Sequence, residues 1–399
     1  MKVSRLVSKL KVFYQIFIVS PKAWHLPKKA EILIYDACGA EALLPYITEY
    51  RVTTMAVRGE LMNMPCLLLA MLKLGFWKGK PLKVYADYFI QVVSPKVVIT
   101  FIDNNSRFYE ISKCFPNVKT IFIQNGRRGD SGDIFENLIQ SDDYHVDYML
   151  VHGRVIGKHY LNYLSGQSIP MGSLKNNAVI KLGKPVVDSV LFISQWRGKL
   201  KCDVPFYIEA DGTPIYWDVF YETEVNVLKF LDKWCAKNNK QLQIGGCSKE
   251  IDGPEHHFYA DQLNKCEWQY IPRIANDSSY KLVDGAEIVI FIDSTLGYEA
   301  ISRGSKTAAF TCRGISIERV ANNFGWPADL PDNGPFWTND QDETQFQRIM
   351  DYLNTVNDED WEQTRQEYAS KQMAFDPGNT RLVALLDQLL PKSDAQHVN

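Results

Sequence analysis

Several signatures that would point directly to a function are missing from this chain of 399 residues. The eight cysteines include no C-x-x-C pair, which argues against a zinc ribbon or a thioredoxin-like centre and favours free thiols. Basic residues are not in excess, since 44 Lys and Arg stand against 47 Asp and Glu, so no nucleic-acid partner is expected. No P-loop, G-x-S-x-G or G-x-G-x-x-G motif joins a predicted strand to a helix, which disfavours NTPases, hydrolases and dehydrogenases.

Long apolar runs are also missing, because no segment has the roughly 18 uninterrupted apolar residues that cross a bilayer. Residues 1–20 begin with basic residues but offer no small-x-small cleavage site, so a signal peptide is not expected. At helical spacing, Leu6 and Leu10 share a face opposite Arg5 and Lys9. Two interpretations stay open: a basic amphipathic helix on an anionic membrane surface, or a first helix packed on its own domain.

What the chain does contain is an alternation of short apolar runs with helical stretches. Runs of Val, Ile and Phe typical of buried parallel strands lie at 32–35, 97–102, 120–124, 148–151, 190–194, 242–245 and 288–292. Helical stretches between them lie at 59–74, 155–164, 222–237 and 297–303. This order predicts an α/β fold with right-handed crossovers.

A polar segment with Gly and Pro, residues 172–185, divides the chain. We therefore predict two Rossmann-like domains, residues 1–177 and 178–399, facing each other across a cleft. Two alternating runs around Asp211-Gly212 predict a β-hairpin insertion at the mouth of that cleft. A C-terminal helical tail, 361–390, is expected to pack back on the first domain.

The segment VIFIDSTLGYEAISRG, 289–304, carries the most specific signal. A buried strand ends at Asp293, and Ser294, Thr295 and Gly297 then open a helix. A helix N-terminus with added hydroxyls suits a phosphate, and Glu299 one turn later can accept from ribose hydroxyls. The alternative is that Ser294 or Thr295 only caps the helix.

Charged residues follow the first strand of the second domain. Arg197 and Lys199 come at the edge where phosphates bind in such sheets, with solvated loop charges as the alternative. Asp218 and Glu222 lie near the start of the next helix and are candidate catalytic carboxylates, although acidic residues favour helix N-termini in any case.

Polar residues also follow two strands of the first domain. Asp103 ends one strand and is a third candidate catalytic carboxylate, while Asn125, Arg127 and Arg128 follow the next strand. The two arginines favour binding of an acidic group, and Asn125-Gly126 alone is also typical of a turn.

Two adjacent histidines, His256 and His257, follow the second strand of the second domain. Adjacent side chains point in different directions on a helix or a strand, so a two-histidine metal site is not expected. We predict instead that His257 faces a phosphate or a sugar.

Several of these segments together resemble the glycosyltransferases of bacterial capsule and O-antigen biosynthesis: PKVVITFIDNN, IFIQNGRRGD, GSLKNN, VLFISQW and STLGYEAISRG, with FGWP and GPFWTN further on. More distantly, the second domain is similar to retaining β-Kdo transferases. Their S-x-x-G-x-E-A element with a following glycine is matched by Ser294, Gly297, Glu299, Ala300 and Gly304. The family's Q-x-x-G-D arrangement is matched from Gln195 to Gly198, with Lys199 where an aspartate is expected.

The resemblance implies a GT-B-type fold and transfer of a CMP-activated ulosonic acid, with β-Kdo as the first choice, to a lipid-linked glycan of the bacterial surface. It implies retention of configuration through an enzyme carboxylate. No metal or other cofactor is expected, because Arg197, Lys199 and the 294–297 turn offset the donor phosphate. The location implied is the cytoplasm, peripheral to the inner membrane, with residues 1–20 as the membrane contact.

Two other functions stay open. The same fold accommodates a transferase that uses a UDP- or GDP-activated hexose. The chain also fits a non-catalytic glycan-binding module of a larger synthase.

Overall fold

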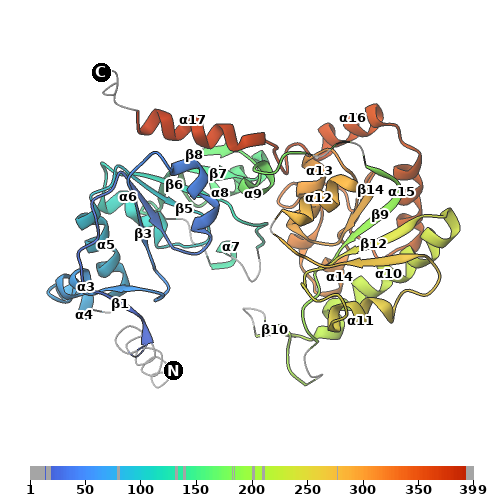
Figure 1. Cartoon of the computed structure of the whole chain (residues 1–399), viewed down its shortest axis with the longest axis horizontal. Coiled ribbons are helices and arrows are strands. Elements are labelled where there is room, and N and C mark those ends of the chain that lie inside the picture. The colour runs from blue at the N-terminus through green and yellow to red at the C-terminus, as the bar shows by residue number, and fades with distance from the viewer. Residues whose placement is uncertain are drawn as a thin grey trace.

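The protein is described from a computed structural model, which covers residue 14 and residues 19–78, 81–130, 134–137, 141–181, 183, 185–199, 203–208, 212–275 and 277–391. It contains two six-stranded sheets in which every neighbouring pair of strands is parallel. The predicted α/β fold with two Rossmann-like domains is confirmed, and Figure 1 shows the domains side by side. Within the described part of the chain, no helix has both the length and the apolarity needed to cross a membrane.

The first domain is built on a sheet with the strand order β3-β2-β5-β6-β7-β8. Its strands are β2 (Ile32–Tyr35), β3 (Val52–Met55), β5 (Val97–Thr100), β6 (Lys119–Ile123), β7 (His145–Val151) and β8 (Ser165–Pro170). Its helices are α2 (Leu44–Ile47), α3 (Met64–Met71), α4 (Leu74–Trp77), α5 (Pro81–Val93), α6 (Ile111–Cys114), α7 (Ile134–Asn137) and α8 (Arg154–Tyr160). A two-stranded pair, β1 (Lys22–Ala23) with β4 (Met62–Asn63), lies beside α3. Apolar side chains cover both faces of the sheet, as central parallel strands require.

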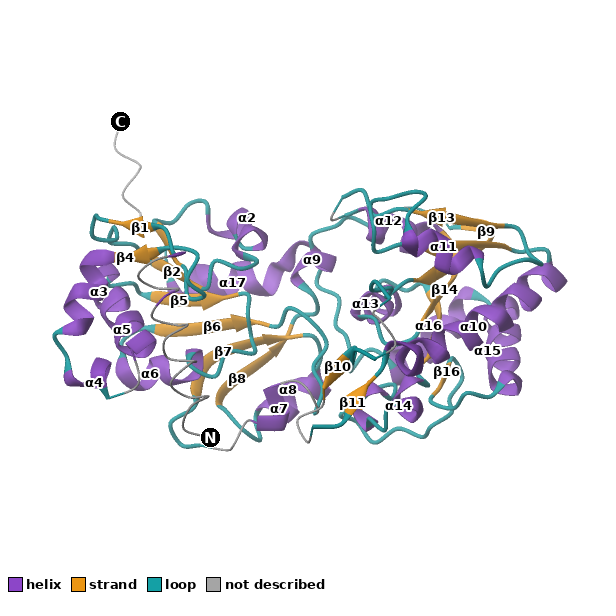
Figure 2. Ribbon diagram, turned by 90° about the horizontal axis from the view of Figure 1, so that it is seen from below, coloured by secondary structure: helices purple, strands orange, loops and turns teal. Residues whose placement is uncertain are grey.

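The second domain has the strand order β13-β12-β9-β14-β15-β16. Its strands are β9 (Val186–Ile193), β12 (Gln241–Gly245), β13 (Trp268–Ile271), β14 (Ala286–Phe291), β15 (Lys306–Phe310) and β16 (Trp337–Thr338). Its helices are α10 (Trp217–Asn238), α11 (Pro254–Ala260), α12 (Ser278–Gly285), α13 (Thr295–Ser302), α14 (Arg313–Ser316), α15 (Glu343–Thr355) and α16 (Asp358–Tyr368). Figures 1 and 2 show α13 on the side of the sheet that faces the first domain, and α10 and α15 on the far side.

All seven predicted strands are present, with ends displaced by a few residues. The sequence reading missed β3, β8, β13, β15 and β16. Four of these, β3, β8, β13 and β16, are edge strands, where one side has no partner strand and polar residues are tolerated, as in the SGQSIP sequence of β8. The fifth, β15, is buried, but its sequence KTAAF contains one β-branched residue, Thr307, and two alanines, which are not typical of a core strand.

The hairpin insertion is present as β10 (Tyr207–Ile208) paired antiparallel with β11 (Pro214–Ile215). Figure 2 shows it between α8 and α14, on the side of the second domain that faces the first. Asp211, the predicted turn residue, lies outside the described residues, and so do residues 1–13 and 15–18 of the predicted amphipathic segment.

The C-terminal tail divides between the two domains. Trp361 of α16 packs in the core of the second domain. The last helix, α17 (Thr380–Leu389), places Leu382, Leu385 and Leu386 in the apolar cluster that covers one face of the first sheet, and Figure 2 shows the helix beside β2 and β5. The chain therefore crosses between the domains twice, which ties them together.

The first crossing is fixed by a buried arginine. A short helix, α9 (Leu174–Asn177), follows β8, and Arg303 at the end of α13 donates from Nη1 to the carbonyl oxygen of Asn176 at 3.2 Å. Arg303 is itself paired with the buried carboxylate of Asp284, with Nε–Oδ1 at 2.7 Å. The domain boundary predicted at residues 177/178 falls between α9 and β9, and it stays a prediction.

Candidate functional site

The N-terminus of α13 lies where the two domains meet. Ser294 is the N-cap, and its Oγ accepts from the amide of Leu296 at 3.3 Å, so the capping role that sequence left open is present. Thr295 Oγ1 accepts from the amide of Arg127 in the first domain at 3.1 Å. This helix start therefore faces across the domain interface.

The two other residues predicted from this segment point into the protein. A Cβ added to Gly297 would lie 2.0 Å from Cγ of Phe291, so this glycine allows α13 to pack directly on β14. Glu299 is buried and accepts from the hydroxyl of Tyr280 at 3.3 Å. Burial raises the pKa of Glu299 against the lowering effect of hydrogen bonds from Ser173 and Tyr280. A ribose-binding role for Glu299 stays a prediction, and in this structure the carboxylate contacts the neighbouring helix.

Arg127 joins the first domain to the second. Its Nη2 donates to the carbonyl oxygens of Ala321 and Asn323, the latter at 2.8 Å, and its guanidinium lies 5.1 Å from the ring centre of Tyr298. The sequence favoured an acidic ligand for this arginine. The structure shows that protein carbonyl groups already engage it.

Asp103 and Arg128 form a buried pair in the first domain. Arg128 donates to both carboxylate oxygens, with Nε–Oδ2 at 2.7 Å. The same oxygens accept from the Tyr160 hydroxyl and from the amide of Asn125, the latter at 3.2 Å. Burial alone would raise the pKa of Asp103, but the Arg128 charge and these hydrogen bonds outweigh it and hold the pKa below its usual value. A catalytic role for Asp103 stays a prediction, and four donors already occupy its oxygens.

A small pocket, with a volume of about 30 Å³, opens beside this pair between the domains. Its wall includes Gln124, Arg127 and His152 from the first domain and Thr295, Tyr298 and Trp326 from the second. His152 is buried, its amide donates to Gln124 Oε1 at 2.9 Å, and its Nε2 has no hydrogen-bond partner in the described structure. Burial lowers the pKa of His152 to about 4, so the imidazole is neutral near pH 7.

A buried ionic network follows the strands of the second domain at their carboxyl ends. Arg313, the first residue of α14 after β15, donates to Asp293 Oδ1 at 2.6 Å and to Glu224 Oε2 at 3.1 Å. Gln195 Oε1, after β9, accepts from the amide of Asp293 at 3.3 Å. Loops that follow three different strands therefore converge on one guanidinium.

The network continues through α11. The hydroxyl of Tyr259 contacts Glu224 and lies 2.7 Å from Ser194 Oγ, which donates to Glu255 Oε1 at 2.5 Å. Glu255 also accepts from the amide of Cys247 at 2.9 Å. The carboxyl edge of the second sheet is thus held rigid by buried polar contacts.

Two carboxyl groups of this network, Glu224 and Asp293, share the Arg313 guanidinium. Burial raises the pKa of Glu224 to about 7, because the lowering effects of Arg313 and the Tyr259 hydrogen bond do not fully offset it, and Asp293 and Glu255 raise it further. Glu224 is therefore close to half protonated at neutral pH. A carboxyl group with a pKa near neutral can transfer a proton, or can donate a hydrogen bond in its neutral form.

The remaining residues predicted for the second domain lie at the exposed rim. Asp218 and Lys199 form an exposed ion pair at 3.0 Å, with Lys199 4.9 Å from the ring centre of Trp217. Glu222 is exposed on α10. The exposed guanidinium of Arg197 makes no hydrogen bond or ion pair to the described residues, while its amide donates to the Tyr221 hydroxyl at 2.6 Å. Arg197 is therefore the cation of this rim most open to a ligand.

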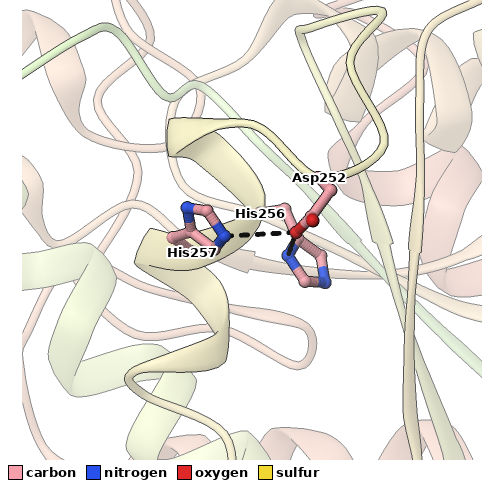
Figure 3. A group of neighbouring side chains, drawn as sticks. All are labelled: Asp252, His256 and His257. Carbon is pink, nitrogen blue, oxygen red and sulfur yellow. Dashed lines mark ion pairs between the residues drawn. The ribbon is translucent and has the colours of Figure 1, made fainter.

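His256 and His257 do converge, contrary to the geometric expectation from sequence. Both rings reach Oδ1 of Asp252, from His256 Nδ1 at 3.4 Å and from His257 Nε2 at 3.1 Å (Figure 3). Asp252 precedes α11, so its carboxylate meets both side chains at the first turn of the helix. These three are the described residues whose ligand atoms lie close enough to share a metal ion. Asp252 and His257 are exposed, and the same distances fit ion pairs, so the expectation of no metal stays untested.

Comparison with known proteins assigns this chain to a family. Residues 121–390, more than half of the chain, match the family model described as "putative O-antigen biosynthesis protein". The chain belongs to this family. None of the curated proteins matches it.

Solved structures show the same two-domain fold as this member of the O-antigen family. A putative UDP-N-acetylglucosamine 2-epimerase from Listeria monocytogenes is 11% identical with a TM-score of 0.52, over 92% of this chain and 98% of that one. The Neisseria meningitidis UDP-GlcNAc 2-epimerase bound to UDP-GlcNAc is 9% identical with a TM-score of 0.50, over 90% and 99%. The predicted GT-B-type fold is confirmed.

Sequence reasoning missed Arg313 and His152 as site residues and did not select Glu224. Arg313 follows β15, whose composition does not indicate a strand, so the sequence predicts no strand end before this arginine. His152 directly follows β7, which the sequence predicts, and the rule that polar residues gather at strand ends would have found it. Glu224 faces inward while its neighbour Glu222 faces solvent, and helical position alone did not distinguish them.

Proposed function

We propose that this chain is a glycosyltransferase of surface-polysaccharide synthesis that takes its sugar from a nucleotide-activated donor. This proposal rests mainly on the pocket between the domains, where the N-terminus of α13 meets Arg127 and His152. The family match supports a role in O-antigen synthesis. The Neisseria protein of the same fold binds UDP-GlcNAc, which supports a nucleotide-sugar ligand for the fold.

The proposed donor is a CMP-activated ulosonic acid, with β-Kdo first. Its phosphate would sit near the N-terminus of α13, where the helix dipole favours an anion, and Arg197 would supply the positive charge. No metal is required in this scheme. The resemblance through Ser294, Gly297 and Glu299 supports the donor class. Gly297 and Glu299 face inward and would act by holding α13 in position.

The proposed reaction is a double displacement at the anomeric carbon. A carboxylate attacks that carbon, the bond to the phosphate oxygen breaks, and CMP leaves with its electron pair. An acceptor hydroxyl then displaces the carboxylate from the anomeric carbon and transfers its proton to a carboxylate that acts as general base. Asp218 and Glu222 are the accessible candidates for this carboxylate, whereas Asp103 is saturated by its four donors.

Nucleotide-dependent melting tests the donor class. CMP should raise the melting temperature more than UDP or GDP, because a ligand at about 100 times its Kd adds about 2.7 kcal/mol to folded-state stability. Arg197→Ala should abolish the shift, and the exposed Arg154→Ala is the matched control. Selective stabilisation by UDP or GDP would favour the hexose transferase instead.

Turnover tests the reaction. CMP-Kdo should release CMP only when a glycan acceptor is present, and Asp218→Asn or Glu222→Gln should stop it while the exposed Glu359→Gln does not. Glycan binding without turnover of any donor would favour the non-catalytic module. Interconversion of UDP-GlcNAc with no transfer to an acceptor would contradict the proposal altogether.

A further inference from the structure

Large apolar side chains are exposed at the end of the first domain formed by α3 and α4. Leu72, Leu74 and Trp77 are 81%, 75% and 66% exposed. Leu68 and Leu69 on α3 are exposed beside them. We call these five residues the α3–α4 patch. Soluble monomers rarely leave such a cluster in water, so a binding partner is expected.

The sequence of α3, MPCLLLAM, is apolar on every side. Its inner side chains Cys66, Leu67 and Ala70 are buried in the domain core. A surface helix of a soluble protein carries polar residues on its outer face, and a helix apolar all round is normally covered on both sides. The outer face of α3 is therefore exposed, although its composition is typical of a helix that is covered on both sides.

The surroundings of the patch are basic. Residues 61–86 contain no Asp or Glu, and Lys73 and Lys78 are exposed within the α3–α4 segment. Residues 20–30 also contain no acidic residue, and their strand β1 pairs with β4 directly before α3. Figure 1 shows β1, α3 and α4 together at one end of the molecule. An apolar surface that carries two exposed lysines complements an anionic one.

We propose that the α3–α4 patch docks on an anionic lipid bilayer. Leu72, Leu74 and Trp77 would enter the boundary between headgroups and acyl chains, with Lys73 and Lys78 among the headgroups. Trp is favoured at that depth, and each lysine near an anionic surface contributes to binding.

Charge argues against the two other candidates for covering the patch. A second copy of the chain would bring lysines against lysines, which disfavours a symmetric contact. The segment 1–20 contains basic residues and no acidic one, so it is also repelled by Lys73 and Lys78. A bilayer with anionic lipids complements both the apolar and the basic residues of this surface.

Flotation of the full-length protein with vesicles tests the proposal. The protein should bind vesicles containing phosphatidylglycerol, bind phosphatidylcholine vesicles weakly, and lose binding as salt rises. Leu72→Asn with Leu74→Asn should lower the partition coefficient by about a hundredfold or more, since full burial of each leucine contributes more than a factor of ten. Lys73→Ala and Lys78→Ala should each lower it about fivefold.

The matched control is Ile251→Asn with Ile274→Asn, which replaces two similarly exposed apolar residues on the second domain and should leave binding unchanged. Equal melting temperatures would show that all variants fold. The proposal is overturned if the wild type ignores anionic vesicles, or if the α3–α4 variant binds like the control. It is also overturned if the α3–α4 variant turns a dimer into a monomer in sedimentation, or if deleting residues 1–13 alone removes all binding.

Discussion

The backbone amide of Arg127 in the first domain donates to the hydroxyl oxygen of Thr295, the first residue of α13 in the second, at 3.1 Å. The side chain of the same arginine reaches the carbonyl oxygens of Ala321 and Asn323. One residue at the end of β6 thus fixes the position of the helix start that we propose for the donor phosphate. The domain interface and the proposed site are built from the same contacts.

Loss of the Arg127 side chain should loosen this interface. We expect Arg127→Ala to cost about 1.5–3 kcal/mol, the usual value for hydrogen bonds to a charged group, and to increase the radius of gyration in small-angle X-ray scattering. The exposed Arg154→Ala should change neither quantity. Identical scattering and melting for the two variants would show that Arg127 does not hold the domains together.

Gly297 should tolerate no side chain, because a Cβ there would lie 2.0 Å from the Phe291 ring. We expect Gly297→Ala to destabilise the protein by about 1–3 kcal/mol, the usual cost of overpacking. Gly285→Ala is the control, since its Cβ would meet nothing within 4 Å and alanine favours the helix. Urea unfolding measures both, and equal midpoints would contradict the packing role assigned to Gly297.

Arg313 is fully buried between Glu224 and Asp293. Arg313→Leu should destabilise the second domain by about 3–5 kcal/mol, because it leaves carboxylates buried without their partner. Lys233→Ala removes an exposed pair with Glu343 and should cost less than about 1 kcal/mol. Calorimetry distinguishes the two cases, and a small effect of Arg313→Leu would mean that the network relaxes by taking up protons.

Glu224 should make stability depend on pH. Its folded pKa of about 7 lies above its usual value of 4.5, so the folded protein holds a proton that the unfolded chain releases between these values. The contribution of Glu224 is complete below pH 4.5 and is lost as pH rises through 7, by on the order of 3 kcal/mol.

Melting curves from pH 4.5 to 8 measure this effect against Glu224→Gln, which keeps a neutral side chain of the same shape. The stability of the wild type relative to Glu224→Gln should fall as pH rises. The exposed Glu359→Gln should run parallel to the wild type. A constant difference between the wild type and Glu224→Gln would show that Glu224 is not protonated in the folded state.

Much of the architecture follows from local sequence. The seven apolar runs predict the central strands, because a parallel strand covered on both faces must be almost continuously hydrophobic. Two runs of alternating apolar and polar residues with a Gly-containing turn between them predict the hairpin. Ser294, as an N-cap, predicts the start of α13. Edge strands such as β8 are not predicted in this way, because a partly exposed strand can contain polar residues.

The direction in which a charged side chain points was decided by the tertiary structure. Arg127 and Arg128 are adjacent and chemically alike in sequence, yet one binds the second domain and the other a buried aspartate of the first. Glu222 and Glu224 lie on the same helix, and only the second meets Arg313. Local sequence sets which residues form a strand or a helix, because that choice depends on neighbours a few positions away. The partner of a charge depends on segments that are distant in the chain and meet only when the sheets have formed.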